Sequence, residues 1–161
     1  GKRVAAGAEG RSHEQPVLRD AIEVRSGDAK QVQRDLRGHT GCVNCVSVAT
    51  DNSQMLSASE DGTVKGWNLH SGDELFTLRG HLAEVYGVDM DAEGHHAVSS
   101  SGDSTVRMWD LNTGRNEATF YCESPAAAVS ISRDGQNVVL GDEVGRVSFL
   151  RLQGINGDLE N

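Results

Sequence analysis

The chain has 161 residues, a formal charge of −9, 19 glycines and two prolines, and only 4% of its residues are aromatic. This length allows one domain whose core is built from aliphatic side chains, and the many glycines predict frequent turns between short strands. The negative charge disfavours nucleic acids and membranes as partners, and no apolar run suits a secretion signal or a bilayer span, so we expect a cytoplasmic protein.

Residues 1–37 predict an irregular first unit of β-structure. The sequence AIEVRSGD at 21–28 aligns with GWNLHSGD at 66–73, so that Ile22 stands at the position of Trp67. The sequence before it supplies one further strand, and an insertion that contains SHEQPVLR lengthens the hairpin between them.

Residues 38–79 and 80–121 are two copies of one unit, because the same motifs return after 42 residues. The repeated motifs are Gly38-His39 with Gly80-His81, Asp61-Gly62-Thr63-Val64-Lys65 with Asp103-Ser104-Thr105-Val106-Arg107, and Trp67-Asn68-Leu69 with Trp109-Asp110-Leu111. Each unit contains four short apolar runs of β type, separated by turn sequences such as SEDG and HSGD. A fixed period of this length indicates a repeat architecture in which each unit is one four-stranded antiparallel sheet.

Residues 122–153 predict a third, degenerate unit with three strands and no Gly-His pair. Leu140, Val144 and Leu150 take positions that are polar in the central units, which avoids a partly satisfied network of buried polar groups. The tail at 154–161 lacks the order of a calcium loop and is expected to fray.

A Gly-His pair followed by D-x-T-V-[KR] and then by Trp-Asp or Trp-Asn, repeated at one spacing, resembles the WD-repeat family. The resemblance implies an all-β fold, a partial β-propeller of about three and a half four-stranded blades around a central channel. It also implies that the protein helps to assemble protein complexes. The sequence VVLGDEVGRVSFLRLQ near the C-terminus is similar to the ends of bacterial propellers attached to NACHT and related STAND signalling NTPases.

The structural tetrad of the WD-repeat family, four side chains joined by hydrogen bonds, carries over onto both central blades. It would comprise His39, Ser57, Asp61 and Trp67 in the first blade and His81, Ser99, Asp103 and Trp109 in the second. These side chains can satisfy one another when buried, whereas each group left unpaired would cost about 1 to 3 kcal/mol. Gly66 stands where a core-facing aliphatic residue is usual in the family, so we expect slightly loose packing around it.

The resemblance also places partners on the face formed by the connections between blades and by the turns after each second strand. Six residues open toward that face: Cys42, Asn44 and Glu60 in the first central blade, and Glu84, Tyr86 and Gly102 in the next. Tyr86 is the best anchor candidate, because aromatic side chains are over-represented among interface hot spots. Ordinary packing or surface exposure is the alternative for each of the six residues.

Neither an active site nor a metal site is expected. Serine, histidine and aspartate occur together in each tetrad, as in a hydrolase triad, but their repetition at identical spacing indicates a structural role. Cys42 and Cys45 lie in an extended run, which separates their α-carbons by roughly 10 Å and disfavours a disulfide or a zinc knuckle. His95 and His96 are adjacent and therefore diverge, and the sequence contains no G-x-x-x-x-G-K-[ST] phosphate loop, so we expect no cofactor.

We therefore expect a non-catalytic scaffold or sensor module of a larger, signalling protein, with other proteins or the remainder of its own longer chain as partners. Because propellers close with about four to eight blades, the chain is expected to be a fragment whose last outer strand comes from upstream of Gly1. The alternatives are a half-propeller that pairs with a second copy to close one ring, and a propeller-fold hydrolase.

Overall fold

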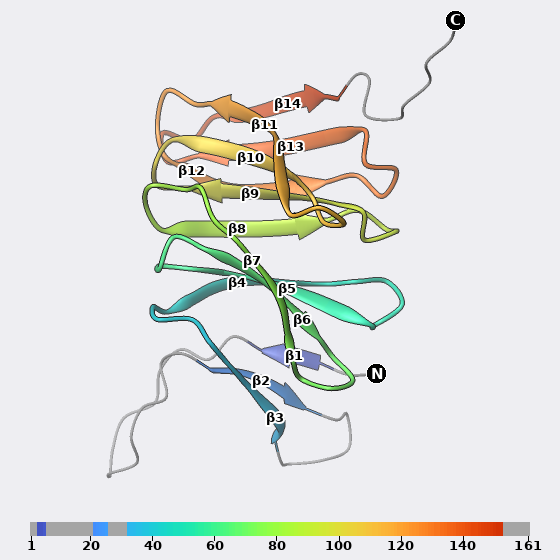
Figure 1. Ribbon diagram of the computed structural model, residues 1–161. Coiled ribbons are helices and arrows are strands. Elements are labelled where there is room, and N and C mark those ends of the chain that lie inside the picture. Colours follow the sequence, from blue (N-terminus) through green and yellow to red (C-terminus); the bar gives the residue numbers. More distant parts are fainter. Residues whose placement is uncertain (1–2, 6–20, 26–31, 153–161) are drawn as a thin grey trace, which may run out of the picture.

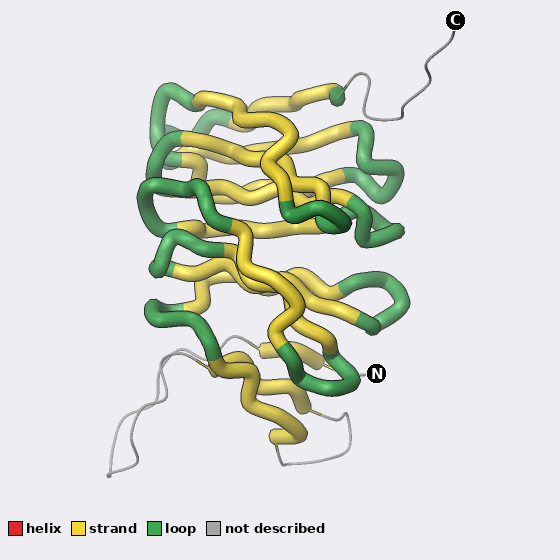
Figure 2. Tube along the Cα trace, viewed as in Figure 1, coloured by secondary structure: helices red, strands yellow, loops and turns green. Residues whose placement is uncertain are grey.

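The computed structural model describes residues 3–5, 21–25 and 32–152, which form β-strands and connecting loops (Figure 2). None of these residues belongs to a helix long and apolar enough to cross a bilayer. The predicted insertion around 12–19 and the predicted tail at 154–161 lie outside the described residues.

The strands form four antiparallel sheets that follow one another along the chain. The first sheet contains β1 (Arg3–Ala5), β2 (Ala21–Arg25) and β3 (Val32–Arg37). The second contains β4 (Val43–Val48), β5 (Gln54–Ser59), β6 (Val64–Asn68) and β7 (Glu74–Leu78). The third contains β8 (Val85–Met90), β9 (His96–Ser101), β10 (Thr105–Asp110) and β11 (Arg115–Tyr121), and the fourth contains β12 (Ala126–Ile131), β13 (Asn137–Asp142) and β14 (Val147–Arg151).

Figure 1 shows the sheets stacked in chain order, from β1–β3 at one end to β12–β14 at the other. Consecutive strands pair within each sheet, so the connections inside a sheet are hairpins. The first strands of the last three sheets, β4, β8 and β12, contact one another along one side of the stack. The predicted all-β fold, with two four-stranded sheets at its centre, is confirmed.

The turn between the second and third strands of each central sheet needs a residue with a left-handed backbone. Gly62 supplies it in the second sheet with φ of 79°, and Ser104 supplies it 42 residues later with φ of 63°. Glycine adopts this conformation without a steric penalty, whereas serine does so at some cost. The turns keep the same backbone shape because the aspartate before each of them, Asp61 or Asp103, has the same hydrogen bonds to make.

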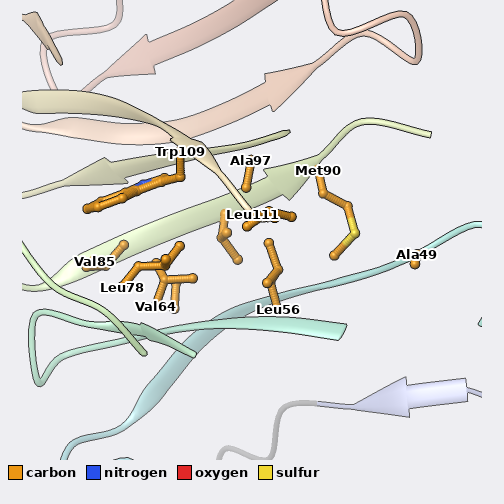
Figure 3. Close-up of a cluster of buried hydrophobic side chains, with 11 residues drawn as sticks. Ala49, Leu56, Val64, Leu78, Val85, Met90, Ala97, Trp109 and Leu111 are labelled. Atoms are coloured by element: carbon orange, nitrogen blue, oxygen red, sulfur yellow. The ribbon is translucent and has the colours of Figure 1, made fainter. Parts of the chain in front are cut away.

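Hydrophobic clusters fill the spaces between neighbouring sheets. Between the second and third sheets (Figure 3), Leu56 and Val64 pack against Val85 and Trp109, and each of these four residues is at most 2% exposed. The cluster between the third and fourth sheets contains Val98, Val106, Met108, Ala126, Ile131, Val138 and Leu140. Burying each such aliphatic side chain stabilises the fold by about 1.5 to 3 kcal/mol, so the sheets are held together mainly by these faces.

The expected loose packing around Gly66 is wrong, because the ring of Phe76 occupies the space beside it. Phe76 lies opposite Gly66 on the neighbouring strand, and a Cβ atom built on Gly66 would come within 2.4 Å of that ring. The glycine and the aromatic residue therefore form a complementary pair across β6 and β7.

A single carboxylate joins the inner strands of three sheets. On β8, Asp89 accepts hydrogen bonds through Oδ1 from the Ser47 hydroxyl of β4 at 3.1 Å. Through Oδ2 it accepts from the Ser130 hydroxyl at 2.7 Å and from the Ile131 N–H at 3.1 Å, both on β12. The packing of neighbouring sheets is thus reinforced at the inner edge by charge-assisted hydrogen bonds.

Candidate functional site

The second sheet contains a buried network that starts at the indole of Trp67. The Trp67 Nε1–H donates to Ser57 Oγ at 2.8 Å, and Ser57 Oγ lies 2.7 Å from His39 Nε2. The other ring nitrogen, His39 Nδ1, lies 2.8 Å from Asp61 Oδ2. The predicted tetrad residues of this sheet are therefore brought together in one hydrogen-bonded chain.

The donors and acceptors of this network fix its proton positions. The ionised carboxylate of Asp61 can only accept, so His39 must carry its proton on Nδ1. His39 Nε2 then accepts from the Ser57 hydroxyl, which in turn accepts from the indole of Trp67. A neutral imidazole satisfies all these contacts, whereas a second proton on Nε2 would face the Ser57 hydroxyl and disturb them.

The protonation equilibria of the network follow its burial and its hydrogen bonds. Desolvation by burial lowers the pKa of His39 below its ordinary value, even though the hydrogen bond to Asp61 opposes that effect. Burial alone would raise the pKa of Asp61, but hydrogen bonds from Thr63, from the Thr40 N–H and from His39 outweigh it and lower this pKa to about 2. The network therefore pairs a neutral histidine with an ionised aspartate.

The third sheet repeats the network. Trp109 donates to Ser99 at 2.8 Å, Ser99 lies 2.7 Å from His81 Nε2, and His81 Nδ1 lies 3.0 Å from Asp103 Oδ2. Burial again lowers the pKa of His81, and the hydrogen bonds on Asp103 lower its pKa to about 2. The four predicted residues of this sheet are thus also brought together.

Each network has a fifth member that the sequence analysis did not assign. The Thr63 hydroxyl donates to Asp61 Oδ1 at 2.6 Å, and the Thr105 hydroxyl donates to Asp103 Oδ1 at the same distance. The threonine of the repeated D-x-T-V motif was the available signal for this role.

The networks hold the connections that enter each sheet. The Thr40 N–H donates to Asp61 at 3.0 Å, and the Leu82 N–H donates to Asp103 at 2.9 Å. Because the serines at their centres, Ser57 and Ser99, are 0% exposed, a substrate could not reach either hydroxyl. The chemistry that this arrangement supports is the positioning of surface loops.

The degenerate fourth sheet replaces the network only in part with apolar packing. Leu140 is 5% exposed and Leu150 is partly buried against the same cluster. Val144, which stands at the aspartate position, is 65% exposed. Apolar packing therefore substitutes for the serine and the tryptophan, while the turn that carries Val144 lies at the surface.

The six predicted partner-binding residues divide between the second and third sheets. In the second sheet, the Cys42 carbonyl accepts a hydrogen bond from the Glu60 N–H at 2.9 Å, and the Asn44 side chain donates to the Val85 carbonyl at 3.0 Å. Asn44 therefore links two sheets in addition to being exposed.

In the third sheet, the predicted residues form one group. The Tyr86 hydroxyl donates to Glu84 Oε2 at 3.1 Å, and a Cβ atom built on Gly102 would lie 3.0 Å from the same hydroxyl. The hydrogen bond to Glu84 raises the pKa of Tyr86, and the nearby charge of Glu143 acts in the same direction. Tyr86 is therefore a partly buried, neutral phenol among carboxylates.

An open depression of about 390 Å³ joins the two groups. Its lining residues are Glu60, Asp61, Gly62, His81, Leu82, Ala83 and Glu84. Two of the six predicted residues, Glu60 and Glu84, therefore line one hollow, and Tyr86 adjoins it through Glu84. The side chain of Leu82 is 90% exposed at this hollow, which the sequence analysis missed. Comparison of the two units offered a signal, because Leu82 stands where the preceding unit has Thr40.

The other polar clusters show no metal-site geometry. His96 Nδ1 lies 3.0 Å from Asp91 Oδ2, whereas His95 Nδ1 lies 3.3 Å from Glu93 Oε2, so the two rings address different carboxylates. Cys45 lies within a strand and its thiol donates weakly to the Val88 carbonyl at 3.7 Å. Among the described residues, no three His, Cys, Asp or Glu side chains are arranged to hold a metal ion.

Two family models match separate parts of the chain. Residues 30–68 match a model described as WD domain, G-beta repeat, and residues 81–152 match a model described as TEP-1 C-terminal beta-propeller. Together these matches cover most of the second, third and fourth sheets.

The chain is also similar to segments of several curated proteins. It is 39% identical over 51 residues to Retinoblastoma-binding-like protein E of Dictyostelium discoideum, which is 32% of this chain and 10% of that protein. It is 38% identical over 47 residues to Small ribosomal subunit protein RACK1 of Candida albicans, which is 29% of this chain and 15% of that protein. It is 49% identical over 43 residues to human NACHT domain- and WD repeat-containing protein 1, which is 27% of this chain and 3% of that protein.

The chain thus spans a small fraction of the length of these relatives. The family matches fall on the repeated sheets that contain the two networks. The protein belongs to the WD-repeat β-propeller family.

Proposed function

We propose that this protein is a non-catalytic interaction module that binds a partner protein in the depression between Glu60 and Glu84. WD-repeat proteins generally mediate protein–protein interactions, which supports this class of function. The observation that carries the proposal is the exposed side chain of Leu82, which lies beside two carboxylates in a hollow supported by both networks.

The chemistry of the depression defines the partner segment. Leu82 offers an apolar contact that is 90% exposed, and Glu60 and Glu84 provide negative charge on both sides of it. The net charge of −9 adds a long-range attraction for cations. The matching partner is therefore a segment that presents an aliphatic or aromatic residue flanked by lysine or arginine.

The networks make the depression suitable for recognition because they fix its walls before a partner arrives. Asp61 and Asp103 hold the backbone on either side of it, through the N–H groups of Thr40 and Leu82. A site that is already ordered loses less conformational entropy when it binds.

In a larger protein, the module would act as the part that recognises a trigger or partner. The similarity to NACHT domain- and WD repeat-containing protein 1, whose name joins the two kinds of domain, supports such a signalling context. The composition supports a cytoplasmic location and disfavours nucleic acid and membrane partners. These features belong to the same proposal.

Selection from a displayed peptide library tests the proposal directly. Peptides selected on the chain should combine basic residues with an apolar residue, and Leu82→Glu should weaken their binding by about tenfold or more. Glu60→Lys with Glu84→Lys should have a similar effect through charge reversal. The matched controls are Leu75→Glu, at an exposed leucine on β7, and Glu93→Lys, at an exposed glutamate in another turn.

Binding that is insensitive to the changes at Leu82, Glu60 and Glu84 would refute this assignment of the surface. Selected peptides without basic residues would refute the proposed chemistry of the partner. Circular dichroism of each variant verifies that the fold is retained, which is expected because all three side chains are exposed.

A further inference from the structure

The last described sheet differs from the two central sheets in its number of strands. The second and third sheets contain four strands each, and their outer strands, β7 and β11, pair with β6 and β10. Among the described residues, the fourth sheet contains β12, β13 and β14 only, so that β14 is its outer strand. Figure 1 shows β14 at the end of the stack.

The backbone of β14 presents hydrogen-bonding groups away from the sheet. The Arg146 carbonyl accepts from the Asp142 N–H at 3.0 Å, and the Leu152 N–H donates to the Gln136 carbonyl at 2.8 Å. These residues therefore direct their backbone groups toward β13. In an antiparallel pair the direction alternates along the strand, so Val147, Phe149 and Arg151 direct their N–H and C=O groups outward.

The side chains of the same residues are exposed as well. Val147 is 76% exposed and Phe149 is 71% exposed. Leu150 pairs with Val138 as Trp109 pairs with Ala97, so Val147 and Phe149 stand at the positions of Val106 and Met108, which are both 0% exposed.

The central sheets show which residues an outer strand places at these positions. Phe120 and Ala118 of β11 lie opposite Val106 and Met108, and in the second sheet Leu78 of β7 lies opposite Val64. Each of these is an apolar pair across the outermost two strands, of the kind that stabilises antiparallel sheets.

A hollow of about 200 Å³ lies beside β14 on the side that faces the third sheet. Its apolar lining comes from Phe120, Tyr121, Leu140 and Leu150, and Tyr121 is 85% exposed. An added strand alternates its side chains between two faces. Every second residue of such a strand could enter this hollow, while the others would cover Val147 and Phe149.

We propose that the outer edge of β14 binds an extended segment of another polypeptide as a fourth, antiparallel strand. The segment resembles β11 in chemistry, with apolar residues two positions apart opposite Val147 and Phe149. Main-chain hydrogen bonds provide affinity, and the hollow and the two exposed side chains provide selectivity. The occupant is a strand because the same edge in both central sheets is occupied by one, so that the new contact continues an interface already present in the molecule. This site lies outside the depression at Leu82 and does not depend on the function proposed there.

A synthetic peptide with the sequence of β11, Arg115–Tyr121, blocked at both ends, is the probe. It is titrated into the full chain while the exchange of backbone amide protons is followed by NMR. Because they become donors to the new strand, the amides of Val147, Phe149 and Arg151 should slow by about tenfold or more at saturation. Phe149→Glu should weaken binding by a similar factor, whereas Leu75→Glu, at an exposed leucine on another strand, should not.

Two N-methylated peptides separate strand addition from simple apolar contact. The Phe120 amide faces β10 in the native sheet, since Cys122 N–H bonds the Ser104 carbonyl and the direction alternates. Methylation of the Phe120 amide should therefore abolish binding, and methylation of the Thr119 amide should leave it intact.

Equal binding of the two methylated peptides would overturn the proposal, as would unchanged amide exchange at millimolar peptide. Protection of the same amides without peptide, together with a dimer mass by light scattering, would also overturn it. In that case a second copy of this chain would cover the edge.

Discussion

Asp61 is the residue on which the first network depends, because it accepts hydrogen bonds from four groups. They are the N–H groups of Thr40 and Thr63, the Thr63 hydroxyl and the His39 ring. Asp61→Asn would replace one acceptor oxygen with a donor that faces these donors. We expect the free energy of unfolding to fall by about 1 to 3 kcal/mol in urea denaturation. Asp51→Asn, in an exposed turn where Ser53 N–H is the printed donor, is the control and should change little.

The same residues determine how stability depends on pH. Burial holds the pKa of His39 and of His81 below the ordinary 6.5 in the folded protein. As the pH falls through 6.5, the unfolded chain takes up protons at these histidines before the folded chain does, and the free energy of unfolding decreases. A second decrease follows between 3.8 and about 2, where the aspartates of the unfolded chain protonate first.

Urea denaturation between about pH 8 and about pH 4 measures this dependence. We expect stability to decline steadily toward the acid end. His81→Gln should flatten the part of the decline near neutral pH, whereas His95→Gln, at an exposed turn, should not. A profile that rises on acidification would contradict the neutral, Nδ1-protonated state assigned to the buried histidines.

Gly66 illustrates what the sequence alone did not predict. The repeat made the network residues recognisable, because His39, Ser57, Asp61 and Trp67 return at one spacing. The packing around Gly66 depends instead on where the Phe76 ring turns, and no motif encodes that rotamer. For the same reason Leu82 was missed, since its exposure becomes apparent only when the loop is placed against the neighbouring turn.

The Gly66–Phe76 pair predicts a measurable coupling. Gly66→Ala should destabilise the fold by about 1 to 3 kcal/mol, because the new methyl group meets the Phe76 ring. Phe76→Leu should reduce that cost when both changes are combined. A double-mutant cycle in urea measures the coupling, and additive effects would show that the ring moves aside freely.

At the scale of the elements, the contacts between sheets depend on Asp89. Its two oxygens bond to Ser47 on one neighbouring strand and to Ser130 and Ile131 on the other. The residue spacing of 42 could be anticipated from the repeat, but Asp89 itself could not, because the equivalent residue of the preceding unit is Ser47. Non-repeating residues of this kind reveal their contacts only in the folded stack.

Asp89→Ala should therefore loosen two interfaces at once. We expect a loss of about 2 to 3 kcal/mol in the free energy of unfolding, together with faster exchange of the Ile131 amide. Ser130→Ala removes one of these hydrogen bonds and should cost less. Equal effects of the two substitutions would mean that the bond to Ser47 contributes nothing.

At the scale of the whole molecule, a stack in which each sheet contacts its neighbours has stability that varies from sheet to sheet. The second and third sheets each contain a complete network, and the largest hydrophobic cluster lies between them. The fourth sheet has apolar substitutes at two network positions, an exposed Val144 and an uncovered outer strand. Native-state hydrogen exchange should therefore show the slowest amides in β5, β6, β9 and β10, and faster exchange in β13 and β14. Since opening of β12–β14 would leave the cluster between the other two sheets intact, the two groups should respond differently to low concentrations of denaturant. Identical exchange free energies in all of these strands would instead show that the described sheets unfold as one cooperative unit, with the inner hydrogen bonds of Asp89 strong enough to couple them.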